Sequence, residues 1–451
     1  MKIVVFDDDP TGSQTVHSCP LLLRWDQESL VDALKNSSPL LFLLANTRSL
    51  SSELAAARTR DMCQSVSQAL VTAGFLLEET LIVSRGDSTL RGHGVVEPEV
   101  INEELGPFDA TFHVPAFFEG GRTTVDGVHL LNGVPVHTTP FAQDQVFGYT
   151  TSNLDLWLEE KSRGLILAEN VVRLTIPALD AAFDSSIGMS CLIEWLLNLS
   201  GNQSVVVDAE LPSQLVALAQ AVRTLVGHKR FLFRSAASLI NGLAMLPSKA
   251  IRSGELSCLR LKAKSGQLKP GLVTVGSYVP LADEQLAMLL MQNGCEGVEL
   301  PAEKIANVIE EDFPQQIIFD LENQLVVQLR DLLISGKTPV LYSSRGELRL
   351  SSFSARIKFG IALAELMARL VANVIDEVGY VISKGGTTTH ILLQKGLNLD
   401  SVQLKGQLLP GLSLVCAENY FLAEGLPIIT FPGNLGDKTT LLVAWRLMEN
   451  K

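Results

Sequence analysis

The stretch Ile3-Val4-Val5-Phe6-Asp7-Asp8-Asp9-Pro10-Thr11-Gly12-Ser13 indicates the fold. Its four consecutive apolar residues are typical of a short strand buried on both faces, and the polar residues that follow are typical of a loop. The same pattern recurs at residues 40–45, 81–84 and 111–114. Amphipathic stretches of helical period separate these runs. The sequence therefore predicts an α/β fold with mainly parallel sheets flanked by helices.

The chain is long enough for two domains. It has 451 residues, of which 47% are apolar and 19% charged, so each domain can bury a large core. A polar segment at residues 263–271 is the predicted linker. We expect one domain at residues 1–262 and a second at residues 272–451, each with a mainly parallel sheet flanked by helices.

Charge and cysteine content exclude several classes of protein. The net charge of −13 argues against a nucleic-acid partner, because binding the phosphate backbone needs a basic surface. The six cysteines are scattered without a CxxC pair, and the histidines lack metal-ligand spacing, so neither a disulfide framework nor a zinc site is expected. We find no signal peptide and no apolar run of about 18 residues. We therefore expect a cytoplasmic protein without membrane contact.

Charged residues gather after the predicted strands of the first domain. Ligands of open α/β sheets bind at the carboxyl ends of the strands, so these residues should converge there. Arginines suit a carboxylate, whereas aspartates accept hydrogen bonds from hydroxyls. The pattern therefore predicts a site for a polyhydroxy acid. The candidate residues are Asp7, Asp8, Asp9, Thr11, Arg48, Arg85, Asp87, Ser88, Arg91, Glu119, Gly121 and Arg122.

Three segments of the second domain combine an apolar strand, a glycine with hydroxyl residues, and a helix. Glycines and helix N-termini let phosphate oxygens approach backbone N–H groups. We therefore predict a nucleotide phosphate site, although no GxxxxGK[ST] motif occurs. Lys384 could add a positive charge, and Asp437 begins the third helix. The segments are Gly276-Ser277, Lys384-Gly385-Gly386-Thr387-Thr388 and Pro432-Gly433 through Gly436-Asp437.

These motifs together resemble the four-carbon acid sugar kinase family, whose members phosphorylate acids such as erythronate, threonate or their 3-oxo relatives with ATP. The resemblance rests on six blocks in the same order. They are Asp7 to Gly12, Asp87-Ser88-Thr89-Leu90-Arg91-Gly92, Pro115 to Thr124, Gly276-Ser277, Gly385 to Thr388 and Pro432 to Gly436.

The resemblance implies an N-terminal sugar-acid-binding domain and a C-terminal nucleotide-binding domain, with an active-site cleft between them. It implies Ser277, the loop 385–388 and Gly433 around ATP, and Asp8, Arg85, Asp87 and Arg91 near the acid. Mg²⁺ would accompany ATP, with no metal ligand assigned. Thr387 is a departure, because many members have an acidic residue at this position. Homodimer formation is left open.

The residues leave the catalytic base open among Asp8, Asp87 and Asp437. Two other functions also remain. Asp7-x-Asp9-x-Thr11 fits the first motif of haloacid-dehalogenase-type phosphatases, in which one aspartate is the nucleophile. Those enzymes need a downstream lysine, however, and residues 1–150 contain only Lys2 and Lys35. The second alternative, favoured by Thr387, is a sugar-acid-binding protein without catalytic activity.

Overall fold

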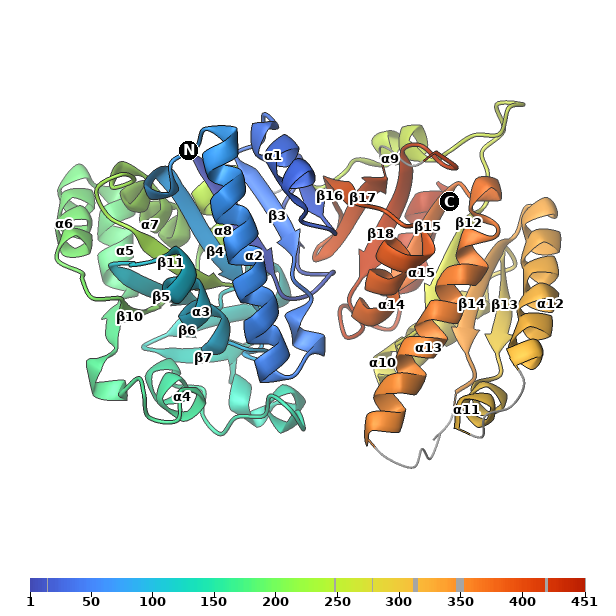
Figure 1. The fold of residues 1–451 in the computed structure, drawn as a ribbon, viewed down its shortest axis with the longest axis horizontal. Coiled ribbons are helices and arrows are strands. Elements are labelled where there is room, and N and C mark those ends of the chain that lie inside the picture. Colours follow the sequence, from blue (N-terminus) through green and yellow to red (C-terminus); the bar gives the residue numbers. More distant parts are fainter. Residues whose placement is uncertain are drawn as a thin grey trace. The chain divides into compact units, whose positions relative to one another are not determined.

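The computed structural model describes residues 1–13, 15–246, 249–277, 279–310, 315–345, 353–417 and 421–450. The chain divides into two compact units, Met1–Lys249 and Ala250–Lys451, called unit 1 and unit 2 below. Figure 1 shows that each unit is a sheet flanked by helices. Within the described residues, no helix is both long and apolar enough to cross a membrane.

Unit 1 is built on a sheet in which all neighbouring strands pair in parallel. The residues of its central strands are buried, as expected for a parallel sheet covered on both faces. In their order across the sheet, the strands are β2 (Cys19–Leu22), β3 (Leu40–Leu44), β1 (Lys2–Asp7), β4 (Thr80–Arg85), β11 (Phe231–Ser235), β5 (Ala110–Val114), β10 (Gln203–Val207) and β9 (Val172–Leu174).

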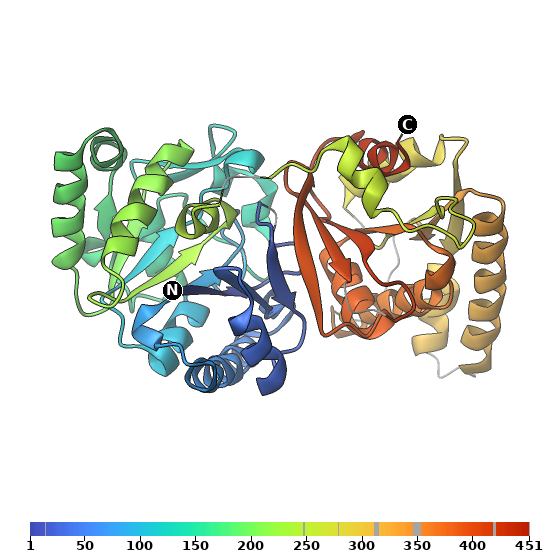
Figure 2. The same ribbon diagram turned by 90° about the horizontal axis from the view of Figure 1, so that it is seen from above.

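Helices cover both faces of the unit 1 sheet (Figure 2). α1 (Gln27–Lys35), α2 (Ser52–Ala73) and α3 (Val96–Leu105) share one apolar cluster with β1 and β3. α7 (Pro212–Thr224) packs against α8 (Ala237–Ala244), α5 (Ile176–Asp184) and α6 (Ser186–Leu197). Burying these apolar faces stabilises the unit by removing them from water.

A small antiparallel sheet lies beside the carboxyl ends of the unit 1 strands. It consists of β6 (Arg122–Val125), β7 (Val128–Leu131) and β8 (Val134–Pro135). The carbonyl and N–H groups of Thr124 exchange hydrogen bonds with Ala209, which follows β10. α4 (Leu154–Lys161) packs through Trp157 and Leu158 into an apolar cluster with Val206 of β10. These contacts fix the segment that carries Arg122 against the main sheet.

Unit 2 contains a mixed sheet. Its strands, in order, are β13 (Cys295–Leu300), β14 (Thr338–Ser343), β12 (Gly271–Val275), β15 (Tyr380–Lys384), β18 (Leu426–Phe431), β17 (Leu412–Ala417) and β16 (Ser401–Leu409). The first five are mutually parallel, whereas β17 runs antiparallel to both of its neighbours. β12, β15 and β18 are therefore adjacent and end at the same edge.

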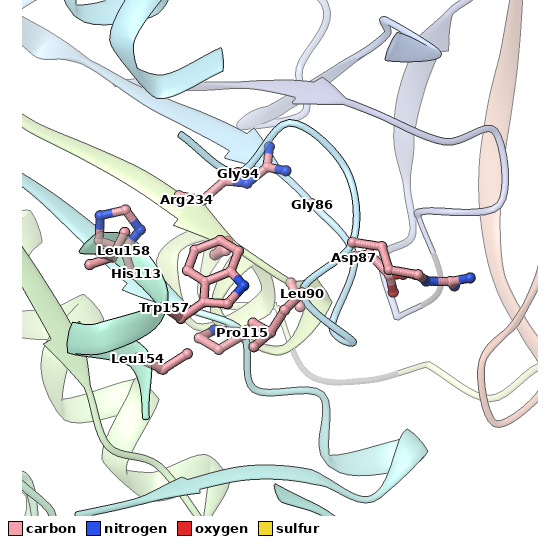
Figure 3. A pocket seen from close by; sticks show the side chains of 13 residues that line it. Gly86, Asp87, Leu90, Gly94, His113, Pro115, Leu154, Trp157, Leu158 and Arg234 are labelled. Carbon is pink, nitrogen blue, oxygen red and sulfur yellow. The ribbon is translucent and has the colours of Figure 1, made fainter. Parts of the chain in front are cut away.

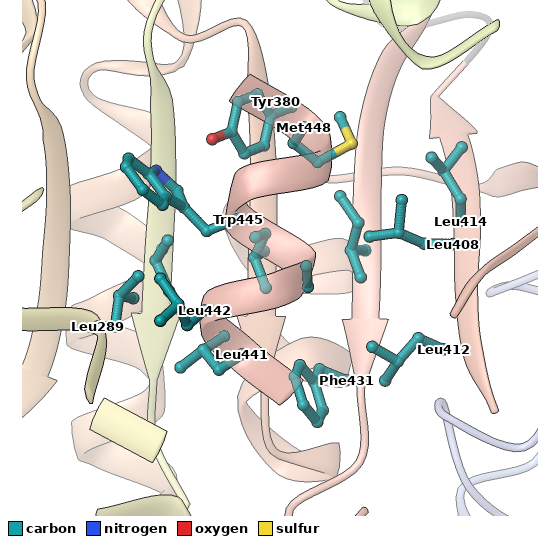
Figure 4. Packing of buried hydrophobic residues seen from close by; sticks show 14 of the residues in the cluster. Leu289, Tyr380, Leu408, Leu412, Leu414, Phe431, Leu441, Leu442, Trp445 and Met448 are labelled. Carbon is teal, nitrogen blue, oxygen red and sulfur yellow. The ribbon is translucent and has the colours of Figure 1, made fainter. Parts of the chain in front are cut away.

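The helices of unit 2 pack around this sheet. α15 (Thr440–Glu449) packs on one face of the sheet, with Leu441, Leu442, Trp445 and Met448 in one apolar cluster (Figure 4). α9 (Ser253–Leu259) and α10 (Pro280–Leu290) contact α15. The remaining helices are α11 (Ala302–Glu310), α12 (Gln315–Ile334), α13 (Phe353–Ala372) and α14 (Gly386–Ile391).

The division between the units falls earlier than the sequence predicted. Residues 250–262, expected at the end of the first domain, pack in unit 2. Ile251 is buried in its core, and Arg260 pairs with Glu449 at 3.0 Å. The predicted linker, residues 263–271, is a turn within unit 2, closed by a bridge between Lys262 and Leu268. Its polar composition therefore reflects a turn rather than a domain boundary.

Most predicted strands and helices occur where the sequence placed them. The four apolar runs of the first half are β1, β3, β4 and β5. In the second half, α14 starts at Gly386, inside the loop 385–388 that was predicted to hold phosphate.

Candidate functional site

Asp8 lies at the centre of a charged cluster in unit 1. Its carboxylate is 2.6 Å from Nη2 of Arg48, 3.2 Å from Nη1 of Arg85 and 3.9 Å from Nη2 of Arg234. These residues come from β1, β3, β4 and β11 or the loops that follow them, and parallel strands bring these ends together. Only 1% of the Asp8 side chain is exposed. Asp8 is therefore a buried carboxylate that holds the three arginine side chains in position.

Asp7 and Asp9 flank Asp8, and their pKa values are shifted in opposite directions. Asp7 lies 3.4 Å from Nη1 of Arg85, yet burial raises its pKa to about 7 against the effect of that arginine. Burial would also raise the pKa of Asp9, but the charge of Arg48 and hydrogen bonds from Thr11 outweigh it and lower the pKa. The N–H of Thr11 donates to Asp9 at 2.8 Å, so Thr11 shapes the loop.

Asp87 follows β4 and is held as an ionised acceptor. Its Oδ2 accepts hydrogen bonds from Nε of Arg91 at 2.8 Å and from Thr89 Oγ1 at 2.7 Å. Nη1 of Arg48 lies 3.8 Å away. Burial would raise the pKa of Asp87, but Arg48, Arg91 and Thr89 outweigh it and hold the pKa well below its usual value. Asp87 is thus a hydrogen-bond acceptor and a weak base.

Arg122 differs from the other arginines of the cluster. Its guanidinium donates to the carbonyl of Gly120 and lies 5.8 Å from the ring centroid of Phe117. Within the described residues, no carboxylate is within ion-pairing distance of Arg122, and its buried Nε has no hydrogen-bond partner. Burial lowers its pKa, although Asp87 acts in the opposite direction. Arg122 is therefore a cation whose charge is not neutralised by a direct contact.

Ser88 and Gly121 contribute through the backbone. The Ser88 carbonyl accepts a hydrogen bond from Nε2 of the buried His129 at 2.7 Å. Gly121 has a φ of 72°, in the left-handed region that favours glycine, and its carbonyl accepts from Asn132 N–H at 2.8 Å. Ser88 and Gly121 thus hold the segments that carry Asp87 and Arg122.

Sequence reasoning missed Arg234 and Glu97. Arg234 pairs with Glu97 and donates to Ser84 Oγ at 2.8 Å, and Glu97 also accepts a hydrogen bond from Thr47. Both side chains are largely buried. Arg234 follows the apolar run Phe231-Leu232-Phe233, and a charge inside such a strand was the available signal.

In unit 2, the three glycine-bearing loops lie side by side because β12, β15 and β18 are neighbours. Gly276 N–H donates to the carbonyl of Lys384 at 3.1 Å, and Gly385 N–H donates to that of Phe431 at 2.9 Å. A Cβ on Gly276 would lie 1.9 Å from Thr388 Oγ1, and one on Gly433 would lie 2.7 Å from Ser277 Oγ. The predicted loops therefore meet, and glycine is required for their close approach.

The other predicted residues of the second and third loops differ in backbone conformation and exposure. Gly385 has a φ of 118°, which residues with a Cβ rarely adopt. Gly386 begins α14, and Thr387 is exposed next to it. Gly436 also has a positive φ, of 83°, before α15.

Lys384 is buried beneath these loops rather than exposed. Its Nζ donates to the carbonyls of Pro432 at 3.1 Å and Gly433 at 3.0 Å and lies 3.9 Å from the ring centroid of Phe431. Burial, aided by the charge of Arg345, lowers its pKa to about 7. Lys384 joins the second loop to the third. Its positive charge would therefore act on a phosphate through the loops and not by direct contact.

Asp437 is an exposed carboxylate beside the third loop. Its Oδ1 accepts hydrogen bonds from Thr439 N–H at 2.8 Å, Thr439 Oγ1 at 2.7 Å and Thr440 Oγ1 at 3.0 Å. Hydrogen bonds from Thr439 are the main cause of its lowered pKa. Gln285 of α10 donates to the Asp437 carbonyl at 2.6 Å. Asp437 therefore shapes the start of α15, while Oδ2 takes part in none of these bonds.

Arg345 was not predicted. It follows β14, donates through Nη1 to the carbonyl of Ser277 at 2.6 Å, and pairs with Asp283 at 3.0 Å. It adds a positive charge beside the first loop. A lone arginine after a strand gave no distinctive sequence signal. Among the residues that the structure describes, no group of three or more His, Cys, Asp or Glu side chains could hold a metal ion.

Comparison with known proteins assigns the two units to two kinds of domain. Residues 3–243 match the sugar-binding N-terminal domain family, and residues 272–441 match the nucleotide-binding C-terminal domain family. The chain belongs to the four-carbon acid sugar kinase family. The resemblance seen in its motifs is thereby confirmed over most of the sequence.

Proteins of known name are similar to this chain at modest sequence identity. The D-threonate kinase of Cupriavidus necator is 26% identical over 381 residues, which cover 80% of this chain and 78% of the relative. The D-erythronate kinase of Heliobacterium modesticaldum is 25% identical over 338 residues, covering 73% and 71%. A crystal structure of a Haemophilus influenzae protein matches 98% of this chain and 99% of its own, with a TM-score of 0.62 and 17% identity, which supports the fold.

The phosphatase alternative finds no support in unit 1. Lys2 lies at the start of β1, whereas Asp7 ends it, and the Lys2 amino group donates to the carbonyls of Asn36 and Ser38. Lys35 ends α1. Neither lysine is placed to assist a nucleophilic aspartate, and the similarity to named kinases supports a sugar-acid kinase instead.

Proposed function

We propose that this protein is an ATP-dependent kinase that phosphorylates a hydroxyl group of a small, four-carbon sugar acid such as threonate, erythronate or a 3-oxo-tetronate. The main support is that the two units carry two different kinds of candidate binding site. Unit 1 concentrates arginines and aspartates at one sheet edge, within the sugar-binding match. Unit 2 brings three glycine loops together at one edge, within the nucleotide-binding match.

The acid would be attracted to unit 1 mainly by Arg122. The other arginines already have carboxylate partners, so an incoming carboxylate would have to compete for them; they are Arg48, Arg85, Arg91 and Arg234. Arg122 has no such partner among the described residues, and it acts electrostatically on both Asp87 and Arg91. Asp87 would accept hydrogen bonds from substrate hydroxyls.

The nucleotide would bind on unit 2 through the backbone. Gly276 and Gly433 let the loops approach one another closely, and backbone N–H groups gathered in this way can bind phosphate oxygens. Ser277 and Thr388 supply hydroxyl donors at the same place. Mg²⁺ bound with the nucleotide would neutralise phosphate charge, and it needs only one or two carboxylates in addition to the phosphates. Asp437 is the exposed carboxylate beside the third loop that could supply one.

Phosphoryl transfer depends mainly on positioning and charge neutralisation, so a strong base is not required. Of the candidate bases, Asp8 is 1% exposed and paired with arginines, whereas Asp87 is 11% exposed. We propose that Asp87 contacts the reacting acid and accepts the hydroxyl proton, and that Asp8 positions the arginines. Asp437 would act on the nucleotide side.

The decisive experiment incubates the full chain with ATP, Mg²⁺ and a panel of four-carbon sugar acids, and measures ADP release together with the phosphorylated acid. We expect turnover of at least one acid and none of glycerol or acetate. Acid binding without ADP formation would instead support the non-catalytic binding protein. The kinase proposal fails if folded protein turns over no member of the panel.

A further inference from the structure

A narrow pocket in unit 1 is lined by both charged and apolar side chains. Asp87 and Arg91 line it together with Arg234 of β11, and Trp157 and Leu158 of α4 form an apolar wall. Figure 3 shows the indole ring of Trp157 between His113 and Leu90. The cavity measures about 30 Å³. This exceeds the roughly 10–15 Å³ that one water needs but is far below the 300 Å³ or more of a typical ligand pocket, so it fits one end of a small ligand.

Three side chains that line this pocket carry polar atoms without partners. Within the described residues, neither ring nitrogen of His113, nor Nε1 of Trp157, nor Oγ of Ser235 has a hydrogen-bond partner. The exposed fractions of these residues are 5%, 4% and 2%. Buried polar groups are nearly always hydrogen-bonded, and leaving one unpaired costs about 1–3 kcal/mol. So many orphaned atoms around one cavity indicate that a bound group completes their hydrogen bonds.

The polar atoms without partners are best satisfied by a ligand group that accepts hydrogen bonds. Trp157 Nε1 can only donate, and the Ser235 hydroxyl can donate as well. Burial and the charge of Arg234 lower the pKa of His113 to about 3, so its imidazole is neutral and offers one donor and one acceptor. Two arginines line the same space, Arg234 paired with Glu97 and Arg91 bonded to Asp87, which is the only carboxylate among the lining residues. A carboxylate fits this arrangement better than a hydroxymethyl group.

The pocket depends on the absence of a side chain at Gly94. A Cβ at this position would lie 2.5 Å from the Trp157 ring, closer than real carbon atoms approach. Gly94 therefore allows the indole to lie where its N–H can reach the cavity. Trp157 and Leu158 also limit how far a ligand can extend, because they form the wall of the pocket.

We propose that this pocket is the carboxylate subsite of unit 1, in which Trp157 Nε1 and Ser235 Oγ donate hydrogen bonds to the carboxylate of a sugar acid. The assignment rests on the proposed kinase function for the identity of the acid. It also sets the orientation, because the end that enters the pocket cannot be the end that is phosphorylated. The acceptor is therefore a hydroxyl that lies outside the pocket, beside Asp87, which lines it.

The test measures binding to the full chain by calorimetry, without ATP. The ligands are D-threonate and D-erythronate, each compared with the polyol that has a hydroxymethyl group in place of the carboxylate, threitol or erythritol. Trp157→Phe removes the N–H and keeps an aromatic ring, and Ser235→Ala removes the hydroxyl. Trp195→Phe, on α6, is the matched control outside the pocket.

We expect the wild-type protein to bind the preferred acid at least tenfold more tightly than its polyol. Each pocket variant should weaken acid binding about tenfold, the usual size for a hydrogen bond to a charged group, and change polyol binding less than about threefold. The control should bind like the wild type. Because Ser235→Ala is a small change, it tests the pocket even if Trp157→Phe does not fold.

Two outcomes would overturn the subsite: equal weakening of acid and polyol, or unchanged acid affinity in both variants. ADP release is measured separately with the same proteins. Selective loss of acid binding without any ADP release would leave the subsite standing and refute the kinase. If ADP is released and neither variant changes the acid affinity, the kinase proposal stands and the subsite is refuted.

Discussion

The two candidate sites use different kinds of chemical group. The site in unit 1 consists of charged side chains that neutralise one another, with Asp8 in contact with three arginines. The site in unit 2 consists mainly of backbone, in which glycines bring three loops together and Lys384 ties them from below. Side-chain charges recognise an acid, whereas backbone N–H groups suit the repeated oxygens of phosphates.

This difference predicts different responses to mutation. In unit 1, removing a carboxylate of the network leaves an excess of buried positive charge, so stability and binding change together. In unit 2, adding a methyl group should block the ligand, while removal of a charge has a smaller effect. The following changes test that contrast.

The largest effect is expected from Asp8→Ala. The change leaves Arg48, Arg85 and Arg234 without their shared partner, and breaking a buried ion pair costs about 3–5 kcal/mol. Urea denaturation should show that loss in the unfolding of unit 1. Asp32→Ala, at an exposed position of α1, should change stability by less than about 0.5 kcal/mol. A cost for Asp8→Ala below about 1 kcal/mol would show that the network does not stabilise unit 1.

Arg122→Ala should weaken sugar-acid binding by about tenfold to a hundredfold, as expected for the loss of hydrogen bonds between a charged guanidinium and the bound acid. Because Arg122 has no carboxylate partner among the described residues, we expect little loss of stability, in contrast to Asp8→Ala. Calorimetry with acid and with ATP checks both ligands, and ATP affinity should not change. Arg163→Ala, at an exposed site, is the control. Unchanged acid affinity in Arg122→Ala would remove Arg122 from the site.

Gly276→Ala should weaken ATP binding by about tenfold, because its Cβ would lie 1.9 Å from Thr388 Oγ1 and push the loops apart. Acid binding to unit 1 should be unaffected. The matched control is Gly254→Ala, where a Cβ would meet nothing within 4 Å. Equal ATP affinity for the two variants would show that close approach of the loops is not needed for nucleotide binding.

The smallest effect is a pH dependence caused by Lys384, whose pKa burial lowers to about 7. Protonated Lys384 attracts phosphate, so ATP affinity should fall a few-fold as the pH rises from 6 to 8. Lys384→Met should remove this dependence. In the unfolded chain a lysine stays protonated up to about pH 10.4. Unfolding therefore takes up a proton between about pH 7 and 10, and the free energy of unfolding should rise with pH over that range. An identical pH profile in Lys384→Met would exclude Lys384 as its source.

The sequence by itself determined the α/β class, the central strands and most of the residues that meet at the two sites. Apolar runs followed by polar clusters predict strand ends, and parallel strands bring their carboxyl ends to one edge whatever their order. For that reason Asp8, Arg48, Arg85 and Asp87 could be grouped from their positions after apolar runs alone. The glycine loops after β12, β15 and β18 could be grouped in the same way.

Only the tertiary structure decided which charges are paired and which atoms are left without partners. The sequence could not distinguish Arg122 from Arg48, because pairing depends on distances between segments far apart in the chain. It could not bring Glu97 to Arg234, or His113, Trp157 and Ser235 around one cavity. It also placed the domain boundary too late, because residues 250–262 belong to unit 2 through burial of Ile251 and Leu256, which local composition does not reveal.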